Sequence, residues 1–216
     1  MSLMASASES KGSFVQVSPG MHLAMCYKIV DLGTQKSEYL GEVKHLPKVM
    51  FQFEVHGDNE QGEPMITPKG EPLTISKNFT LSLAEKATLR RDLQTWRGKE
   101  FTAAELKGFE LKNVLSKWCM LSVVHSTVGD KTYANIQAIM PIPDIVKKAG
   151  LPTPHNESSL YSIQDNDHDA LNSFSTYIQD KIKASPEWQS LNRAPKENKS
   201  VTPPHPMDDL ESDIPF

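Results

Sequence analysis

Alternation of apolar and polar residues predicts β-strands along the first two thirds of the chain. The clearest segment is 48–56, in which Val49, Phe51, Phe53 and Val55 fall on one face. Side chains point to alternate faces of a strand, so this period of two residues is typical of a strand with one buried side. Alternation or an apolar run predicts four further strands, at 21–31, 73–81, 118–126 and 131–140.

Glycine and proline residues mark the connections between these strands. Residues 32–45 contain two glycines among polar spacers, which predicts a loop or a ragged hairpin. Residues 57–72 hold three glycines and three prolines, so we expect a long loop there. Gly129 and Asp130 stand between the last two strands, and a glycine at the first of two turn positions favours a type II′ hairpin.

Two short helices are predicted between the third and fourth strands. The first has an apolar stripe at helical spacing, formed by Leu89, Leu93 and Trp96. Ser82 is expected to begin this helix, because Glu85 completes a capping box, and Gly98 is expected to end it. Thr102 and Glu105 form a second capping box, which predicts the start of the second helix.

The C-terminal part of the chain has a different pattern. Residues 151–159 are rich in proline and predict a connector. A helix is predicted over 168–183, with Asp167 as its N-cap. Its apolar stripe consists of Leu171, Phe174, Ile178 and Ile182. Ser185 and Pro186 are expected to start one further helical turn.

Composition and charge divide the 216 residues into four regions. We expect a disordered leader at 1–13, a folded domain at 14–150, a connector with helices at 151–191 and a disordered tail at 192–216. The net charge is −4, and residues 151–216 hold 11 acids but only 5 bases. Acidic tails behind weakly basic domains occur in proteins that handle nucleic acid; the alternative is a tail that only aids solubility.

The sequence has no features of a membrane-spanning, secreted or disulfide-rich protein. No apolar run reaches the roughly 18 residues of a membrane-spanning helix, and the N-terminus lacks the apolar core of a secretory signal. With only Cys26 and Cys119 present, a disulfide framework is not expected, and a reducing cytoplasm is the simplest location.

Motifs for catalysis are also missing from the sequence. It contains no Gly-rich phosphate loop, no nucleophile elbow and no paired Cys or His at zinc-ligand spacing. The acids Asp165, Asp167 and Asp169 lack the glycine and the terminal glutamate of a calcium loop, so we interpret them as a helix start. We therefore expect no enzymatic activity, no cofactor and no metal.

The order of the predicted elements is three strands, a helical segment and two strands, which is the order of the OB-fold. We predict a mainly β protein: a five-stranded OB-fold barrel over 14–150 with a helical insertion between strands 3 and 4, followed by C-terminal helices and a disordered acidic tail. Such barrels bind oligonucleotides on the face of strands 2 and 3 and in the adjoining loops.

Basic and aromatic residues alternate along the predicted barrel, and residues 77–118 hold 9 bases and 5 acids. Proteins that bind single strands use cations to follow the backbone and exposed aromatic rings to stack on bases. The candidate DNA-binding residues are Tyr27, Lys28, Lys48, Lys77, Phe79, Arg90, Arg91, Arg97, Lys117, Trp118, Lys131 and Tyr133.

Several of these candidates have a structural alternative. Tyr27 and Phe79 fit a core position and a stacking position about equally well. Trp118 and Tyr133 flank the predicted hairpin, which favours exposure. The arginines of the first helix are also compatible with an ordinary solvated helix face.

The chain ends in an acidic peptide, residues 207–216, whose last four residues read Asp-Ile-Pro-Phe. It resembles the C-terminal peptide of bacterial single-stranded-DNA-binding proteins. That resemblance implies docking on partner enzymes: apolar anchors enter a pocket, the terminal carboxylate pairs with a base, and the acids face a basic rim. The candidate partner-binding residues are Asp208, Asp209, Glu211, Asp213, Ile214, Pro215 and Phe216.

The rest of the chain resembles a phage-encoded family of single-stranded-DNA-binding proteins. The resemblance lies in VDLGTQ at 30–35, FTLSL at 79–83, LQTWRGKEFT at 93–102, GFELKN at 108–113 and YANI at 133–136. Ser116 stands where that pattern often has glycine, which should alter a turn. The resemblance implies an OB-fold protein that coats single-stranded DNA without sequence preference during replication, recombination and repair.

This resemblance also implies that host or phage replication and repair proteins bind the C-terminal peptide. An alternative is a recombination mediator that anneals strands, with DNA binding as a secondary activity. The sequence leaves the oligomeric state open.

Overall fold

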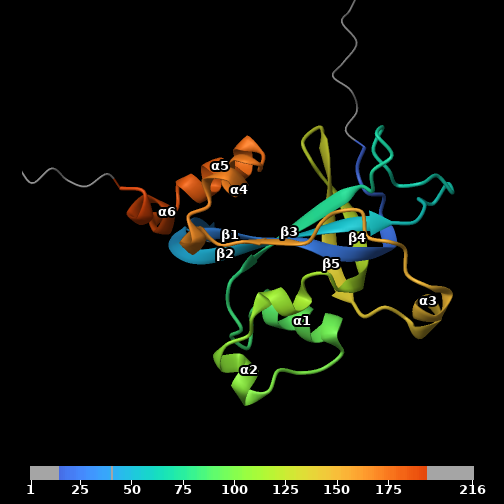
Figure 1. Ribbon diagram of the computed structural model, residues 1–216, viewed down its shortest axis with the longest axis horizontal. Helices are drawn as coiled ribbons and strands as arrows, with labels where there is room; N and C mark the ends of the chain where they lie inside the picture. The colour runs from blue at the N-terminus through green and yellow to red at the C-terminus, as the bar shows by residue number, and fades with distance from the viewer. Residues whose placement is uncertain (1–14, 40, 194–216) are drawn as a thin grey trace, which may run out of the picture.

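The computed structural model describes residues 15–39 and 41–193, and it is built on one antiparallel sheet (Figure 1). The strands lie in the order β3-β2-β1-β4-β5. Their bounds are Gly20–Tyr39 for β1, Glu42–His56 for β2, Thr74–Thr80 for β3, Trp118–Val128 for β4 and Lys131–Met140 for β5. The prediction of a mainly β protein with these five strands is confirmed.

The sheet is open at β3 and β5, since no strand ladder joins them within the described residues. The two edges still approach each other, because Lys77 Nζ on β3 donates to the carbonyl oxygen of Gln137 on β5 at 3.4 Å. Helix α1 (Thr88–Arg97) packs against both strands and so covers the opening from one side.

The main core lies between the sheet and α1. The apolar face predicted for 48–56 is fully buried, with Val49, Phe51, Phe53 and Val55 all inside. The stripe predicted for the helix is buried against them, and it consists of Leu89, Leu93 and Trp96. Burying apolar side chains from both elements is what holds α1 on the sheet.

Of the two alternatives predicted for the segment 32–45, a loop or a ragged hairpin, the structure has the hairpin, and it is long. β1 continues to Tyr39 and β2 begins at Glu42, and the two strands pair from Leu23 and His56 to Tyr39 and Glu42. Register shifts occur in β1 between Cys26 and Lys28 and again between Asp31 and Gly33. Each such bulge adds a residue and exchanges the faces, so the simple alternation that marks a strand in a sequence is lost here.

The first helix begins later than its sequence indicates. α1 starts at Thr88 without a side-chain cap, and the Ser82 hydroxyl instead accepts from the amide of Ala84, so the predicted capping box is wrong there. Residues 83–87 form a turn before the helix, because Leu83 packs against the core and fixes the chain outside the helical path. The predicted stop is confirmed, since Gly98 has φ 65.

The second helix, α2 (Ala103–Lys107), begins as predicted with a complete capping box from Thr102 and Glu105. A 3₁₀ turn, η1 (Leu111–Val114), then leads into β4. In the connection that follows, Ser116 has φ 60, a backbone conformation that favours glycine. This is the position at which the sequence departs from the phage pattern.

Residues 141–166 add one helix, one strand and one 3₁₀ turn that the sequence pattern did not predict. α3 spans Asp144–Ala149, β6 spans Ser159–Tyr161 and η2 spans Ile163–Asp165. β6 pairs with β1 in parallel, with Ile29 opposite Leu160, at the edge that β4 leaves free. The connector is thereby fastened to the sheet.

The helix predicted over 168–183 is broken into two. α4 spans His168–Asn172, with Asp167 as its N-cap as predicted, and α5 spans Thr176–Lys183. The Phe174 amide donates to the carbonyl of Leu171, which closes α4 before α5 begins. α6 (Pro186–Leu191) follows the Ser185 cap, as predicted.

These C-terminal helices cover the face of the β1–β2 hairpin opposite to α1 (Figure 1). They form a second apolar core, made of Val30, Leu32, Met50, Tyr161, Ile163, Leu171, Ile182 and Trp188. Within the described residues, every helix is too short or too polar to cross a bilayer.

Candidate nucleic-acid interface

Strand β3 connects two surface pockets. Thr74 and Ser76 line the first, and Asn78 lines the second; all three are exposed. Since a strand rises about 3.3 Å per residue, Thr74 and Asn78 lie about 13 Å apart. The polar side chains of β3 therefore form a continuous surface between the two pockets.

The lysine pocket, with a volume of about 310 Å³, lies at the Asn78 end of β3. Its lining residues are Leu32, Gln35, Lys36, Ser37, Lys48, Asn78 and Lys181. Lys48 Nζ donates to the Thr80 hydroxyl at 2.8 Å, which holds the side chain without neutralising its charge. No acidic side chain is among the described residues that line the pocket.

The tyrosine pocket, with a volume of about 280 Å³, lies at the Thr74 end of β3. It is lined by Gln16, Val17, Thr74, Ile75, Ser76, Tyr133 and Ala134. The Tyr133 side chain comes from β5 and is 47% exposed. Lys131, at the start of the same strand, is exposed as well. Both residues belong to the β4–β5 hairpin, but only Tyr133 lines the pocket, so this end of β3 offers an accessible ring.

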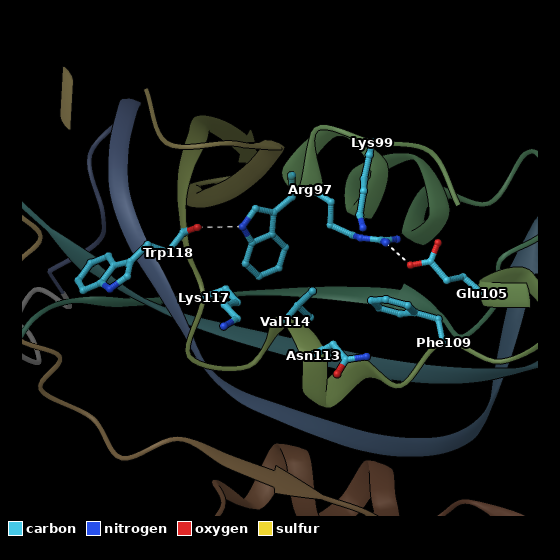
Figure 2. A pocket seen from close by; sticks show the side chains of 9 residues that line it. Arg97, Lys99, Glu105, Phe109, Asn113, Val114, Lys117 and Trp118 are labelled. Atoms are coloured by element: carbon cyan, nitrogen blue, oxygen red, sulfur yellow. Dashed lines mark hydrogen bonds and ion pairs between the residues drawn. The ribbon is translucent and has the colours of Figure 1, made fainter. Parts of the chain in front are cut away.

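A third pocket, the cleft of about 470 Å³ in Figure 2, lies around the end of α1, α2 and the start of β4. It is lined by Trp96, Arg97, Lys99, Glu105, Phe109, Asn113, Val114, Lys117 and Trp118. Lys99 and Lys117 are exposed at this cleft. It therefore brings together three of the predicted residues, Arg97, Lys117 and Trp118.

Arg97 is committed to contacts within the protein. It forms an ion pair with Glu105, and its guanidinium carbon lies 4.5 Å from the Phe101 ring centre and 4.8 Å from that of Phe109. The amide of Thr102 donates to Glu105 and, together with Arg97, lowers the pKa of that carboxyl. Arg97 thus ties α1 to α2 and contributes little free positive charge.

Trp118 takes part in the cleft mainly through its backbone. Its carbonyl oxygen accepts a hydrogen bond of 2.9 Å from Trp96 Nε1, while its ring points away from Arg97 and Phe109 (Figure 2). The ring packs against His56, with 5.0 Å between ring centres, and is half-buried. The cleft therefore has no exposed indole from Trp118, and the predicted exposure of this ring is wrong.

Two predicted residues are buried, and a third, Lys77, is half-buried and paired with an acid. Phe79 is 3% exposed and packs edge-on against Phe51, at 5.2 Å between ring centres. Tyr27 is also buried, and burial raises the pKa of its hydroxyl. Lys77 forms an ion pair of 2.7 Å with the buried Asp92. None of these three side chains offers a surface to a nucleic acid in this structure.

The remaining predicted cations occupy separate places. Lys28 Nζ lies 5.4 Å from the centre of the Phe174 ring, under the C-terminal helices. Arg90 donates to the carbonyl of Leu83 at 3.4 Å. Arg91 lies 3.3 Å from Asp92 on the exposed side of α1. These three residues join neither of the two pockets along β3.

Glu54 fastens the connector across the outer face of β1 and β2. Its carboxylate is 0% exposed and accepts hydrogen bonds from the His56 ring at 2.9 Å and from the backbone amides of His155 and Asn156 at 3.1 and 2.8 Å. Burial alone would raise its pKa, but the bonds from His56, Asn156 and His155 outweigh burial and lower it. Beside this covered region, Thr74, Ser76 and Asn78 of β3 remain exposed.

Sequence reasoning missed four residues of the lysine pocket that could contact a ligand: Gln35, Lys36, Asn78 and Lys181. Gln35 and Lys36 lie in the segment predicted as a loop or a ragged hairpin, and Lys181 lies 145 positions from Lys36 in the chain. The one feature of the sequence that could have pointed to Lys181 is its spacing of four residues from Tyr177, which places a basic and an aromatic side chain on the same face of a helix. The predicted partner-binding residues, 208–216, lie outside the described residues.

The described part of the chain contains neither a metal-binding cluster nor an accessible cysteine thiol. No group of three or more His, Cys, Asp or Glu side chains there is arranged to hold a metal ion. Cys26 and Cys119 are buried, and burial raises the pKa of both thiols.

No protein-family model and no curated protein sequence matches the chain.

Proposed function

We propose that the sheet and α1 are an OB-fold whose barrel is open between β3 and β5. Support comes from the strand order β3-β2-β1-β4-β5, with the helix that follows β3 packed across the gap. The OB-fold is itself a partly open five-stranded barrel. In that fold, the loop between strands 1 and 2 and the loop between strands 4 and 5 flank the binding face.

We further propose that the protein binds single-stranded DNA without sequence preference. The observation that carries this proposal is the continuous polar surface of β3, with the lysine pocket at one end and Tyr133 at the other. Cations along such a path neutralise phosphates, and an exposed ring stacks on any base because every base has a π-face. Contacts of this kind do not read a sequence.

The C-terminal peptide then recruits partner proteins to the bound strand. Ile214 and Phe216 supply apolar anchors, and Pro215 limits the entropy lost on binding. The carboxylate of Phe216 and the four preceding acids favour a basic docking surface. The partners of such a peptide are the replication and repair proteins of the host or phage. The protein acts in the cytoplasm, where it coats and protects single strands, and it is not an enzyme.

The substitution Tyr133→Ala tests this proposal. Loss of a stacking ring costs about 1–3 kcal/mol, so affinity for a poly-dT oligonucleotide should fall by roughly 5- to 150-fold in a fluorescence titration. Tyr133→Phe keeps the ring and should retain most of the affinity. Equal affinity of Tyr133→Ala and the wild type, with both folded, would refute the placement of DNA along β3.

A further inference from the structure

Helix α5, which lies outside the predicted barrel, contributes Lys181 to the lysine pocket and places Tyr177 next to Lys181. Lys181 lines the pocket beside Lys48 and Lys36. Tyr177, one turn earlier, is 65% exposed, and Lys181 Nζ lies 4.6 Å from the centre of its ring. The three lysines come from α5, β2 and β1, so the pocket exists only while α5 is docked on the hairpin.

The docking of α5 and α6 rests on the segment Asp31 to Gln35 of β1. Gln35 Nε2 donates both to the Leu32 carbonyl, at 2.6 Å, and to the Lys181 carbonyl, at 2.9 Å. The Thr34 amide donates to the Glu187 carboxylate at 2.9 Å. Burial would raise the Glu187 pKa, but the bonds from Thr34 outweigh it and lower that pKa.

In the same segment, the backbone of β1 lies very close to the start of α6. Gly33 has φ +66, and a Cβ added there would lie 2.5 Å from the Cβ of Ser185, the residue that caps α6. Ile182 of α5 and Trp188 of α6 are buried in the second core beneath these contacts. α5 is therefore held in a fixed position, and Lys181 with it.

The lysine pocket concentrates positive charge. Like charges gathered in one pocket repel each other, and neither Lys48 nor Lys181 contacts a carboxylate in the described residues. An anionic ligand would relieve this repulsion. Asn78 connects the pocket to the polar surface of β3, and Tyr177 places an accessible ring at its rim.

We propose that the C-terminal helices form part of the DNA-binding surface: Lys181, with Lys48 and Lys36, binds a backbone phosphate, and Tyr177 stacks on a neighbouring base. This inference rests on the proposed function. It adds a second contact point at the opposite end of β3 from Tyr133. The single strand then runs along β3 from the β4–β5 hairpin to α5.

The test compares Lys181→Gln with Lys183→Gln in the full chain. Lys183 carries the same charge on the same helix, but it is absent from the pocket lining and contacts Gln179. Binding to a poly-dT oligonucleotide is titrated at several salt concentrations. For Lys181→Gln we expect affinity to fall by roughly five-fold or more and the slope of log K against log salt to become shallower by about 0.7. Lys183→Gln should match the wild type.

A second pair of variants tests the ring. Tyr177→Ala should weaken binding by roughly five-fold or more, whereas Tyr177→Phe should not. The melting temperatures of all four variants show whether α5 remains docked.

Each result has a definite meaning. If Lys181→Gln equals Lys183→Gln while Tyr133→Ala still weakens binding, the inference is overturned and the proposed function stands. If Lys181→Gln binds DNA more tightly than the wild type, the pocket receives the acidic tail of the chain and not DNA, which also overturns the inference. A wild-type protein that fails to bind single strands would refute the proposed function itself.

Discussion

Gly33 is a residue at which β1 comes close to the second core and to the start of α6. Its positive φ is easily adopted only by glycine, and a methyl group there would also lie 2.6 Å from Ser185 Oγ and 2.9 Å from Ile163 Cδ1. A left-handed conformation alone costs an L-residue about 1–2 kcal/mol, and the contacts add to that cost. One residue thus controls how closely α6 approaches β1.

Gly33→Ala should therefore destabilise the protein by more than about 1–2 kcal/mol in urea unfolding. Gly70→Ala is the matched control, because Gly70 has φ +82 but nothing within 4 Å of an added Cβ. Gly70→Ala should show the backbone cost alone. Equal destabilisation by the two substitutions would mean that the helices do not pack on Gly33 as described.

At the scale of elements, regular alternation predicted the strands, and end signals predicted the helix ends, wherever tertiary contacts did not override the local pattern. The β2 face with Phe51 and Phe53, the Gly98 stop and the Thr102 capping box follow from local pattern alone. The Ser82 box failed because Leu83 packs on the core and holds the chain out of the helix. β1 was cut short because its bulges interrupt the alternation.

The candidate site was harder to predict than the strands. Lys48 and Tyr133 could be chosen from sequence because a basic residue or ring next to a strand end favours exposure. Phe79 and Tyr27 follow the same pattern, yet both face the protein interior. Tyr27 lies at a bulge that changes which side of β1 is buried, and Phe79 packs on the Phe51 ring. Lys181 reaches the site only through the docking of α5, which no local pattern encodes.

The C-terminal peptide is an element whose charge should compete with DNA. It carries four acids in residues 208–216, and a tethered acidic segment can occupy the same cations as phosphates. Deleting residues 208–216 should strengthen binding to single-stranded DNA at about 10–50 mM salt, where the Debye length is long, and have little effect at high salt. Titration of the full and shortened chains measures this. Unchanged affinity at low salt would rule out competition but not partner docking.

At the scale of the whole molecule, helices pack on both faces of the sheet, and the polar side chains of β3 remain exposed. α1 covers the main core, while α4–α6 cover the opposite face of the β1–β2 hairpin and the connector is fastened to Glu54 of β2 (Figure 1). The two pockets along β3 therefore mark the path on which a nucleic acid can meet both cations and an exposed ring. A duplex, whose bases are already stacked, gains nothing from Tyr133 or Tyr177.

The most direct test of this account is a fluorescence titration of the full chain with a poly-dT oligonucleotide and with a duplex of equal length, over a range of salt concentrations. If Lys36, Lys48, Lys131 and Lys181 each neutralise one phosphate, log K for the single strand should fall against log salt with a slope of roughly −3. Affinity for the duplex should be clearly lower at every salt concentration. Equal affinity for the two, or binding to the single strand that does not change with salt, would contradict the account.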